Sequence, residues 1–435
     1  MAYVSSKKDI INQSVVVYNT FGVVREERQL NLCSGERVIY YLDVSRVIEV
    51  DSIITENIEP YEINYDFDTL EPGKLLEKFL GKEVVFYDPD SNKKFRGILL
   101  SNYGGYIIKD IKTHEVYVSP KGEIILPCLP EGFVLRSTLI LKILPTACRK
   151  FSLSYITGAL NWSANYTVEL HSEQYLDLKC WGKVTNNTGI DFKNTNLSLV
   201  AGDIKRVRNG PIIPYEAKGA MALKSSAVQA DIAPASLGDY YIYNHDTPTD
   251  LNNETSKQIR LFSSRSVRYI KYYTNPYGSD ELVTVIEFKN SKENNLGMPL
   301  PSGIAKVYDR VRGEGSLEFI GEDLLESTPE EELVKLELGR PFNIVFEKKQ
   351  VDYKRFTDYE EYEYEILIKN TGNENAVVKA IHYIGGDWRM LSSTDRFIKK
   401  DANNIEFLVN VAPKTEKRIV FRYAVNTTSS LNRFI

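Results

Sequence analysis

The stretch YLDLKCWGKVTNNTGIDFKNTNLSLVAGD, residues 175–203, predicts two β-strands joined by a tight turn. The first strand ends at Thr185, and the second carries Leu197 and Leu199. The turn Asn186-Asn187-Thr188-Gly189 lies between them, and Asn and Gly tolerate the positive φ angles of tight turns. Short strands parted by turn residues recur along the rest of the chain, which favours antiparallel sheet.

Upstream, residues 15–54 consist of the short β-branched runs VVVYN, GVVREERQL, RVIYYLDV and VIEVDSI. In RVIYYLDV, apolar residues fall on both sides of the alternation, which suits a strand covered on both faces. The 28 tyrosines add to this signal, because Tyr fits a half-buried pleated surface. These features predict a mainly β fold with several antiparallel β-sandwich units and very few helices.

One short helix is expected within residues 70–80, where Leu75, Leu76, Phe79 and Leu80 have helical spacing. Five brief runs follow it, KEVVFY, KFRGILLS, GYIIKD, HEVYVS and EIILP. A helix with five short strands predicts a small inserted barrel of the SH3-like or Sm-like kind, and some such barrels bind RNA. Nine basic residues against eight acidic ones between 70 and 127 leave RNA binding as a minor alternative.

The chain length and these patterns predict four domains. Residues 1–69 form an N-terminal β region that pairs with the central sheet, and residues 70–130 form the helix and barrel. Residues 131–329 form a central antiparallel β domain with a mobile loop over 208–239, which is rich in Ala, Gly, Pro and Ser. Residues 330–435 form an immunoglobulin-like sandwich.

Composition limits the classes of partner. A formal net charge of −5, from 54 basic and 59 acidic residues, gives no global attraction to nucleic acid or anionic lipid. The four cysteines are widely spaced, which indicates core thiols in a reducing compartment, although one pair could still form a disulfide. They are Cys33, Cys128, Cys148 and Cys180.

The N-terminal residues contain no uninterrupted apolar run after Lys7 and Lys8, so they predict no export signal. The most apolar stretch, residues 135–147, is far shorter than the roughly 20 residues that span a bilayer. We therefore expect a cytoplasmic protein without a transmembrane segment. The alternative is an exported or envelope-associated protein whose natural N-terminus is processed or missing.

Several longer blocks carry a family resemblance, among them YNTFGVVREERQL, SYITGALNWSANY, PLPSGIAKVY and GEDLLESTPEEELVKLELGRPFNI. Together they resemble, over nearly the full length, the conserved hypothetical bacterial proteins of domain of unknown function 4139. The resemblance implies a shared architecture and no established activity. Members are often described as envelope-associated or mucoidy-inhibitor-like, and this chain departs from those that carry an export signal.

The sequence lacks the sharp motifs of catalysis and metal binding. It has no P-loop, no Gly-x-Ser-x-Gly elbow and no Cys-x-x-Cys, and its four histidines are isolated. The turn at residues 88–92 begins like a calcium loop, but Lys93 stands where that loop needs Gly, so a hairpin turn is expected. We therefore predict no catalytic residue, no cofactor and no metal.

The run DYEEYEYEILIKN, residues 358–370, offers the best carboxylate cluster. Alternation sets Tyr362 and Tyr364 on one face and Glu361, Glu363 and Glu365 on the other, which predicts a strand with a solvated face. A pair of glycosidase carboxylates is the alternative interpretation.

The leading hypothesis is a non-catalytic, multidomain β protein for interaction or assembly, with a protein partner or a second copy of itself. A glycan-binding or carbohydrate-active protein is the first alternative, with Trp162, Tyr166 and Trp388 as candidate ligand-binding residues beside core packing. RNA binding through the barrel is the second, although nucleic acid is not the expected partner.

Overall fold

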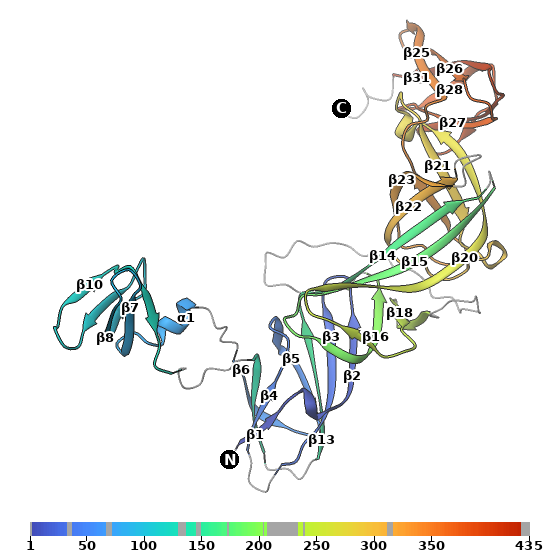
Figure 1. The fold of residues 1–435 in the computed structure, drawn as a ribbon. Coiled ribbons are helices and arrows are strands. Elements are labelled where there is room, and N and C mark those ends of the chain that lie inside the picture. Colours follow the sequence, from blue (N-terminus) through green and yellow to red (C-terminus); the bar gives the residue numbers. More distant parts are fainter. Residues whose placement is uncertain are drawn as a thin grey trace, which may run out of the picture. The chain divides into compact units, whose positions relative to one another are not determined.

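The structure, a computed structural model, describes residues 2–32, 37–66, 72–128, 136–144, 149–171, 174–202, 204–206, 234–237, 240–310 and 316–427. The fold is mainly β, as predicted, and the described residues contain one α-helix (Figure 1). The chain divides into two compact units, each built from segments that are not contiguous. The first is Met1–Asn161, Thr185–Ser198 and His245–Lys257, and the second is Trp162–Val184, Leu199–Asn244 and Gln258–Ile435.

The first unit contains two sheets whose strands come from before residue 70 and from after residue 130. One has the order β1-β4-β12-β6, and the other includes β16-β2-β3-β13-β5 with β19 paired to β16. The N-terminal β region therefore pairs with strands that follow residue 130. The bounds are β1 Ala2–Ser5, η1 Lys7–Asp9, β2 Ile10–Val17, β3 Gly22–Gln29, β4 Val38–Leu42, β5 Ile48–Glu56, β6 Pro60–Asp66, β12 Thr138–Ile143, β13 Lys150–Thr157, β16 Phe192–Ala201 and β19 Thr249–Leu251.

A buried charged network joins strands β3 and β4 of this unit. The Arg28 Nε donates to Glu26 Oε2 at 3.0 Å, and the Tyr41 hydroxyl donates to the same oxygen at 2.5 Å. Gln13 Nε2 donates to the other carboxylate oxygen at 2.7 Å, and Arg28 also donates to the Leu42 carbonyl. Because every member has a partner, the network can lie in a core that otherwise excludes charge.

The segment after residue 71 forms the predicted short helix followed by a five-stranded antiparallel sheet with the order β10-β9-β8-β7-β11. Phe79, Val84, Phe86, Leu99 and Ile108 make its core. The β7–β8 hairpin turns where it was predicted to. Its similarity to an SH3-like or Sm-like barrel stays a prediction. The bounds are α1 Pro72–Glu77, β7 Glu83–Asp88, β8 Lys93–Ser101, β9 Ile107–Asp110, β10 Val116–Val118 and β11 Glu123–Ile125.

The second unit is built on a long sheet with the order β23-β22-β14-β15-β20-β27-β30-β29, in which β21 pairs with both β20 and β24. The bounds are β14 Leu160–Leu170, β15 Tyr175–Asn186, β17 Pro234–Leu237, β18 Tyr240–Asn244, β20 Thr255–Thr274, η2 Pro276–Gly278, β21 Val283–Lys289, η3 Lys292–Asn294, β22 Gly303–Arg310, β23 Leu317–Leu325, β24 Leu333–Glu337, β27 Ala376–Tyr383, β29 Ile398–Lys399 and β30 Asn404–Val411.

This sheet is mixed, so the domain predicted as antiparallel over 131–329 also contains parallel strand pairs. Strand β14 pairs with β22 in parallel, and β20 pairs with β27 in parallel. Parallel strands need a long connection rather than a tight turn, and a local sequence pattern does not reveal which distant strand will become the neighbour.

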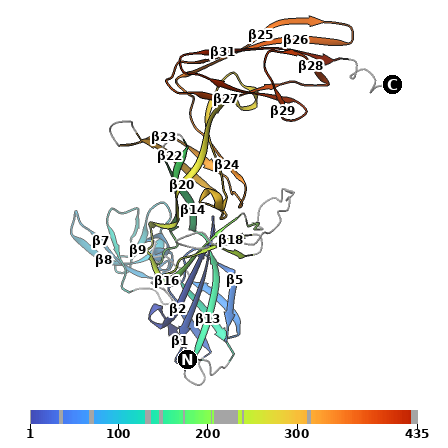
Figure 2. The same ribbon diagram turned by 90° about the vertical axis from the view of Figure 1, so that its right-hand side faces the viewer.

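The C-terminal part of the second unit is a two-layer sandwich. One layer has the order β25-β26-β31-β28, and it faces strands β27, β29 and β30 (Figure 2). Its core takes residues from both layers, including Ile366, Val378, Phe407 and Phe421. The finer immunoglobulin-like assignment stays a prediction. The bounds are β25 Ile344–Arg355, β26 Tyr359–Asn370, β28 Trp388–Ser393 and β31 Glu416–Asn426.

The predicted loop falls largely outside the described residues. Of the loop predicted over 208–239, the structure describes only Pro234–Leu237, which forms β17 and pairs with β18. Residues 311–315 also lie outside the described residues, and the strands on either side of them, β22 and β23, pair antiparallel.

Candidate functional site

Two of the three predicted ligand-binding residues lie in the protein core. Trp162 and Tyr166, both on β14, are 3% and 1% exposed. The Trp162 Nε1 donates to the Val200 carbonyl at 2.9 Å, and the Tyr166 hydroxyl donates to the Pro301 carbonyl at 2.6 Å. The interpretation of these rings as exposed platforms for a glycan is therefore wrong. Strand alternation carries both side chains inward, and the backbone carbonyls satisfy their polar atoms.

The third candidate, Trp388, is half-buried on β28, which belongs to a different sheet from β14. Its Nε1 donates to the Ala402 carbonyl at 2.7 Å, and the Lys399 ammonium lies 4.8 Å from its ring centroid. The three predicted residues therefore do not form one site.

The carboxylates of β26 behave as the sequence predicts for a solvated face. Glu361 accepts from the Arg422 guanidinium at 3.2 Å, Glu363 pairs with the same guanidinium, and Glu365 accepts from Arg418 at 3.2 Å. These carboxylates are neutralised by cross-strand arginines. An acid and a base that work as a pair would instead need different environments, so this row is structural.

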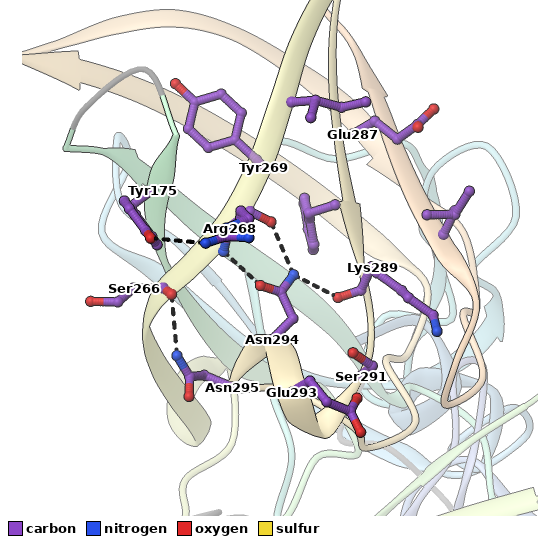
Figure 3. Close-up of a pocket in the computed structure, with 13 residues that line it drawn as sticks. Tyr175, Ser266, Arg268, Tyr269, Glu287, Lys289, Ser291, Glu293, Asn294 and Asn295 are labelled. Atoms are coloured by element: carbon purple, nitrogen blue, oxygen red, sulfur yellow. Dashed lines mark hydrogen bonds between the residues drawn. The ribbon is translucent and has the colours of Figure 1, made fainter.

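A different feature stands out on the second unit, an open groove of about 530 Å³. It lies on the outer face of strands β20, β21 and β24, beside the loop that contains η3 (Figure 3). The described residues that line it are Tyr175, Ser266, Arg268, Tyr269, Ile270, Glu287, Phe288, Lys289, Ser291, Glu293, Asn294, Asn295 and Leu333.

Strand register explains which side chains reach the outer face. Tyr269 pairs with Phe288, which in turn pairs with Val334, and all three side chains are buried on the inner face. Their neighbours therefore point outward in two rows across the sheet. One row contains Ile270, Glu287 and Lys335, which pair across the three strands. In the other row Lys289 pairs with Leu333, and the exposed Arg268 directly precedes Tyr269 on β20.

Asn294 closes one wall of the groove where the pairing of β20 with β21 ends. Its amide oxygen accepts from the Arg268 backbone N–H at 2.7 Å, and its amide nitrogen donates to the carbonyls of Arg268 and Lys289, each at 2.9 Å (Figure 3). Next to it, the Asn295 amide donates to the Ser266 carbonyl at 3.1 Å. The two side chains take over the hydrogen bonds of the ladder, so the wall is fixed.

Most charged groups around the groove are already paired. Lys289 forms an ion pair with Glu331, which lies outside the groove. Glu287 accepts a hydrogen bond from the Tyr272 hydroxyl at 3.0 Å and lies 3.7 Å from the Lys335 ammonium. These pairs leave little net charge on that side of the groove.

Arg268 differs from its neighbours. Its Nη2 donates to the Tyr175 hydroxyl at 3.4 Å, and no carboxylate of the described residues lies within ion-pair distance of it. The hydrogen bond with the Tyr175 hydroxyl raises the pKa of Arg268, so the guanidinium stays charged. In Figure 3 its side chain points toward Tyr175, while the Lys289 ammonium and the Glu287 carboxylate point away from it.

The sequence did not single out this groove. The run RYIKYY, residues 268–273, has the composition of a strand, and its alternation could have placed Arg268 and Ile270 on one face. Which charges around Arg268 are already paired depends on β15, β21, β24 and the η3 loop coming together, and no local motif encodes that arrangement.

His382 on β27 is the one titratable group with an unsatisfied buried atom among the described side chains. It is 4% exposed, with its ring 4.4 Å from the Tyr364 ring and 4.9 Å from the Phe421 ring. Its Nε2 lies 3.4 Å from the Tyr423 hydroxyl, and its Nδ1 has no partner. Burial, and to a smaller extent the charge of Lys348, lowers the pKa of His382 to about 4.

The described residues show neither a metal-binding cluster nor a membrane-spanning helix. They contain no group of three or more His, Cys, Asp or Glu side chains that could hold a metal ion. No helix among them is long and apolar enough to cross a membrane.

Comparisons with known proteins add no relative to these observations. Neither a protein-family model nor a curated protein sequence matches this chain. The resemblance to domain of unknown function 4139 therefore rests on the quoted sequence blocks alone.

Proposed function

We propose that this chain is a non-catalytic protein for interaction or assembly, and that it binds segments of partner proteins in the groove on β20, β21 and β24. The observation that carries the proposal is the exposed Arg268 guanidinium, which has the Tyr175 hydroxyl as its hydrogen-bond partner and lies beside apolar side chains. An arginine without a carboxylate partner next to exposed aliphatic groups is typical of a recognition surface.

The chemistry of the lining supports recognition over catalysis. A general acid or base needs a group that gains and loses a proton near neutral pH, whereas a guanidinium stays protonated. The carboxylate of Glu287 is held by Tyr272 and Lys335, and the pKa of Glu293 is lowered by hydrogen bonds to backbone and to Ser291. The groove is therefore equipped to hold a ligand in place.

The alternatives have less support. Glycan binding loses two of its three expected aromatic residues, since Trp162 and Tyr166 are buried. RNA binding by the β7–β11 segment gains no electrostatic support. Residues 70–127 contain nine basic residues against eight acidic ones, so they have almost no net positive charge.

The proposal is tested with the full-length chain on an array of random heptapeptides and, in parallel, on a glycan array. We expect binding to a restricted set of peptides. Leu333→Trp, which fills the groove at a 52% exposed position, should abolish that binding. Leu324→Trp is the matched control, because Leu324 is 51% exposed on β23 outside the groove. Peptide binding that survives Leu333→Trp, or binding to glycans alone, would contradict the proposal.

A further inference from the structure

We infer that the groove recognises an extended peptide segment that carries an Asp or Glu side chain and, two residues along, an aliphatic side chain. This ligand class rests on the function proposed above and deepens it. Three features of the second unit lead to it: the donors around Arg268, the spacing of the outward side chains on β20, and the aliphatic character of the flanking surface.

The donors around Arg268 suit a carboxylate. A guanidinium has five N–H donors in a planar fork, and the Tyr175 hydroxyl engages one of the Arg268 nitrogens. The Tyr175 hydroxyl accepts that bond, so its own hydrogen can be donated to a ligand. A carboxylate could therefore accept from the Arg268 fork and from the Tyr175 hydroxyl together, in the charge-assisted geometry that is strongest for this pair.

The spacing along β20 suits an extended peptide. Arg268 and Ile270 are two residues apart on one face of the strand, which corresponds to about 7 Å. An extended peptide repeats its own side chains on one face at the same interval of about 7 Å. A segment that follows β20 can thus set a carboxylate on Arg268 and its next side chain of the same face on Ile270.

The flanking surface favours an aliphatic residue at that second position. Ile270 and Leu333 are each 52% exposed, although both line the groove. Sugars stack on flat aromatic faces, and the exposed aromatic residue of the lining, Tyr175, has the Arg268 guanidinium 5.9 Å from its ring centroid. An acidic peptide therefore fits this surface better than an acidic sugar does.

The two carboxylates of the lining do not oppose an acidic ligand on Arg268. The Glu287 carboxylate is nearly buried and is held by Tyr272 and Lys335. Glu293 lies in the field of Lys289 and Lys292, and neither carboxylate contributes to the raised pKa of Arg268. An incoming carboxylate on Arg268 thus meets a cation that no carboxylate of the described residues neutralises.

The experiment is calorimetric titration of the full-length chain with three probes. They are the capped peptide Ac-Ala-Glu-Ala-Leu-Ala-NH2, its Gln-for-Glu analogue and D-glucuronic acid. We expect the Glu peptide to bind about tenfold more tightly than the Gln peptide, as one charge-assisted contact would give. Arg268→Gln should remove this difference. Arg265→Gln, a change to another exposed arginine of β20 outside the lining, should preserve it.

Three results would overturn the inference: equal affinity for the two peptides, tighter binding of glucuronic acid, or an equal loss with Arg265→Gln. Failure here is distinguishable from failure of the proposed function. If the array yields peptides without acidic residues whose binding depends on Leu333, the groove binds peptides and only the acidic ligand class is wrong. If no array peptide is sensitive to Leu333→Trp, both are wrong.

Discussion

Replacing His382 by Phe should remove the part of the acid sensitivity of the C-terminal sandwich that comes from this buried imidazole. The imidazole is buried among Tyr364, Phe421 and Tyr423, and its pKa is lowered from 6.5 to about 4. The folded state therefore holds His382 neutral, while the unfolded state binds a proton as the pH falls through 6.5. Stability is lost progressively between pH 6.5 and pH 4, and above that window the residue contributes no pH dependence.

The magnitude follows from the size of the shift. Each unit of pKa difference corresponds to about 1.4 kcal/mol. The pKa of His382 is 6.5 in the unfolded state and about 4 in the folded state, so the free energy of unfolding falls by roughly 3 kcal/mol once the residue is fully protonated. Between pH 6.5 and pH 4.5 the expected loss is about 2 kcal/mol. Phe has a similar ring size and no buried nitrogen, so His382→Phe should lack this loss and should remain folded at pH 7.5.

Hydrogen exchange followed by mass spectrometry measures the local stability of the sandwich at each pH, over peptides that cover β27 and β31. Comparing wild type and variant at each pH cancels the intrinsic pH dependence of exchange. His114→Asn is the control, because His114 is exposed with a φ of 61°, which Asn tolerates. Equal loss of protection in wild type and His382→Phe between pH 6.5 and pH 4.5 would refute the reasoning.

Three further outcomes are expected. Glu26→Gln leaves the Arg28 guanidinium buried without its counter-ion, so urea unfolding should report a loss of about 3–5 kcal/mol, and a loss below 1 kcal/mol would contradict it. Burial raises the pKa of Cys180, so iodoacetamide at pH 8 should modify the exposed Cys128 in the native protein and spare Cys180, as peptide mass spectrometry can check. Gly303→Val places a Cβ against a β14 carbonyl, so thermal unfolding should shift down by several degrees, whereas an unchanged midpoint would contradict that close approach.

Where a local pattern was enough, the sequence predicted the structure well. The alternation in residues 358–370 put the glutamates of β26 on a charged outer face and Tyr362 and Tyr364 against the core, as observed. Strand β4 is covered on both faces, since Ile39 and Tyr41 are buried and their neighbours half-buried. The short helix also lies within the predicted residues, as α1 at Pro72–Glu77.

The sequence could not show which strands, far apart along the chain, pair with one another in the sheets. The parallel pairing of β14 with β22 joins segments more than a hundred residues apart. Trp162 lies against Tyr243, and Tyr166 lies against Phe262, so distant segments bury two rings that a local interpretation left open as surface rings. The groove has the same origin. In the sequence Arg268 is one charged strand residue among many. It lines a groove because the fold brings β21, β24 and the η3 loop beside it, and because the charged residues nearby pair with one another.

Methyl NMR of the full-length chain, with isoleucine labelled at the δ1 position, locates the ligand most directly. On titration with Ac-Ala-Glu-Ala-Leu-Ala-NH2, the Ile270 methyl in the groove should shift in a saturable manner. Ile398, which is similarly exposed on β29, should not shift. An unperturbed Ile270 methyl at saturating peptide, or shifts centred on Ile398, would contradict the assignment of the groove as the recognition site.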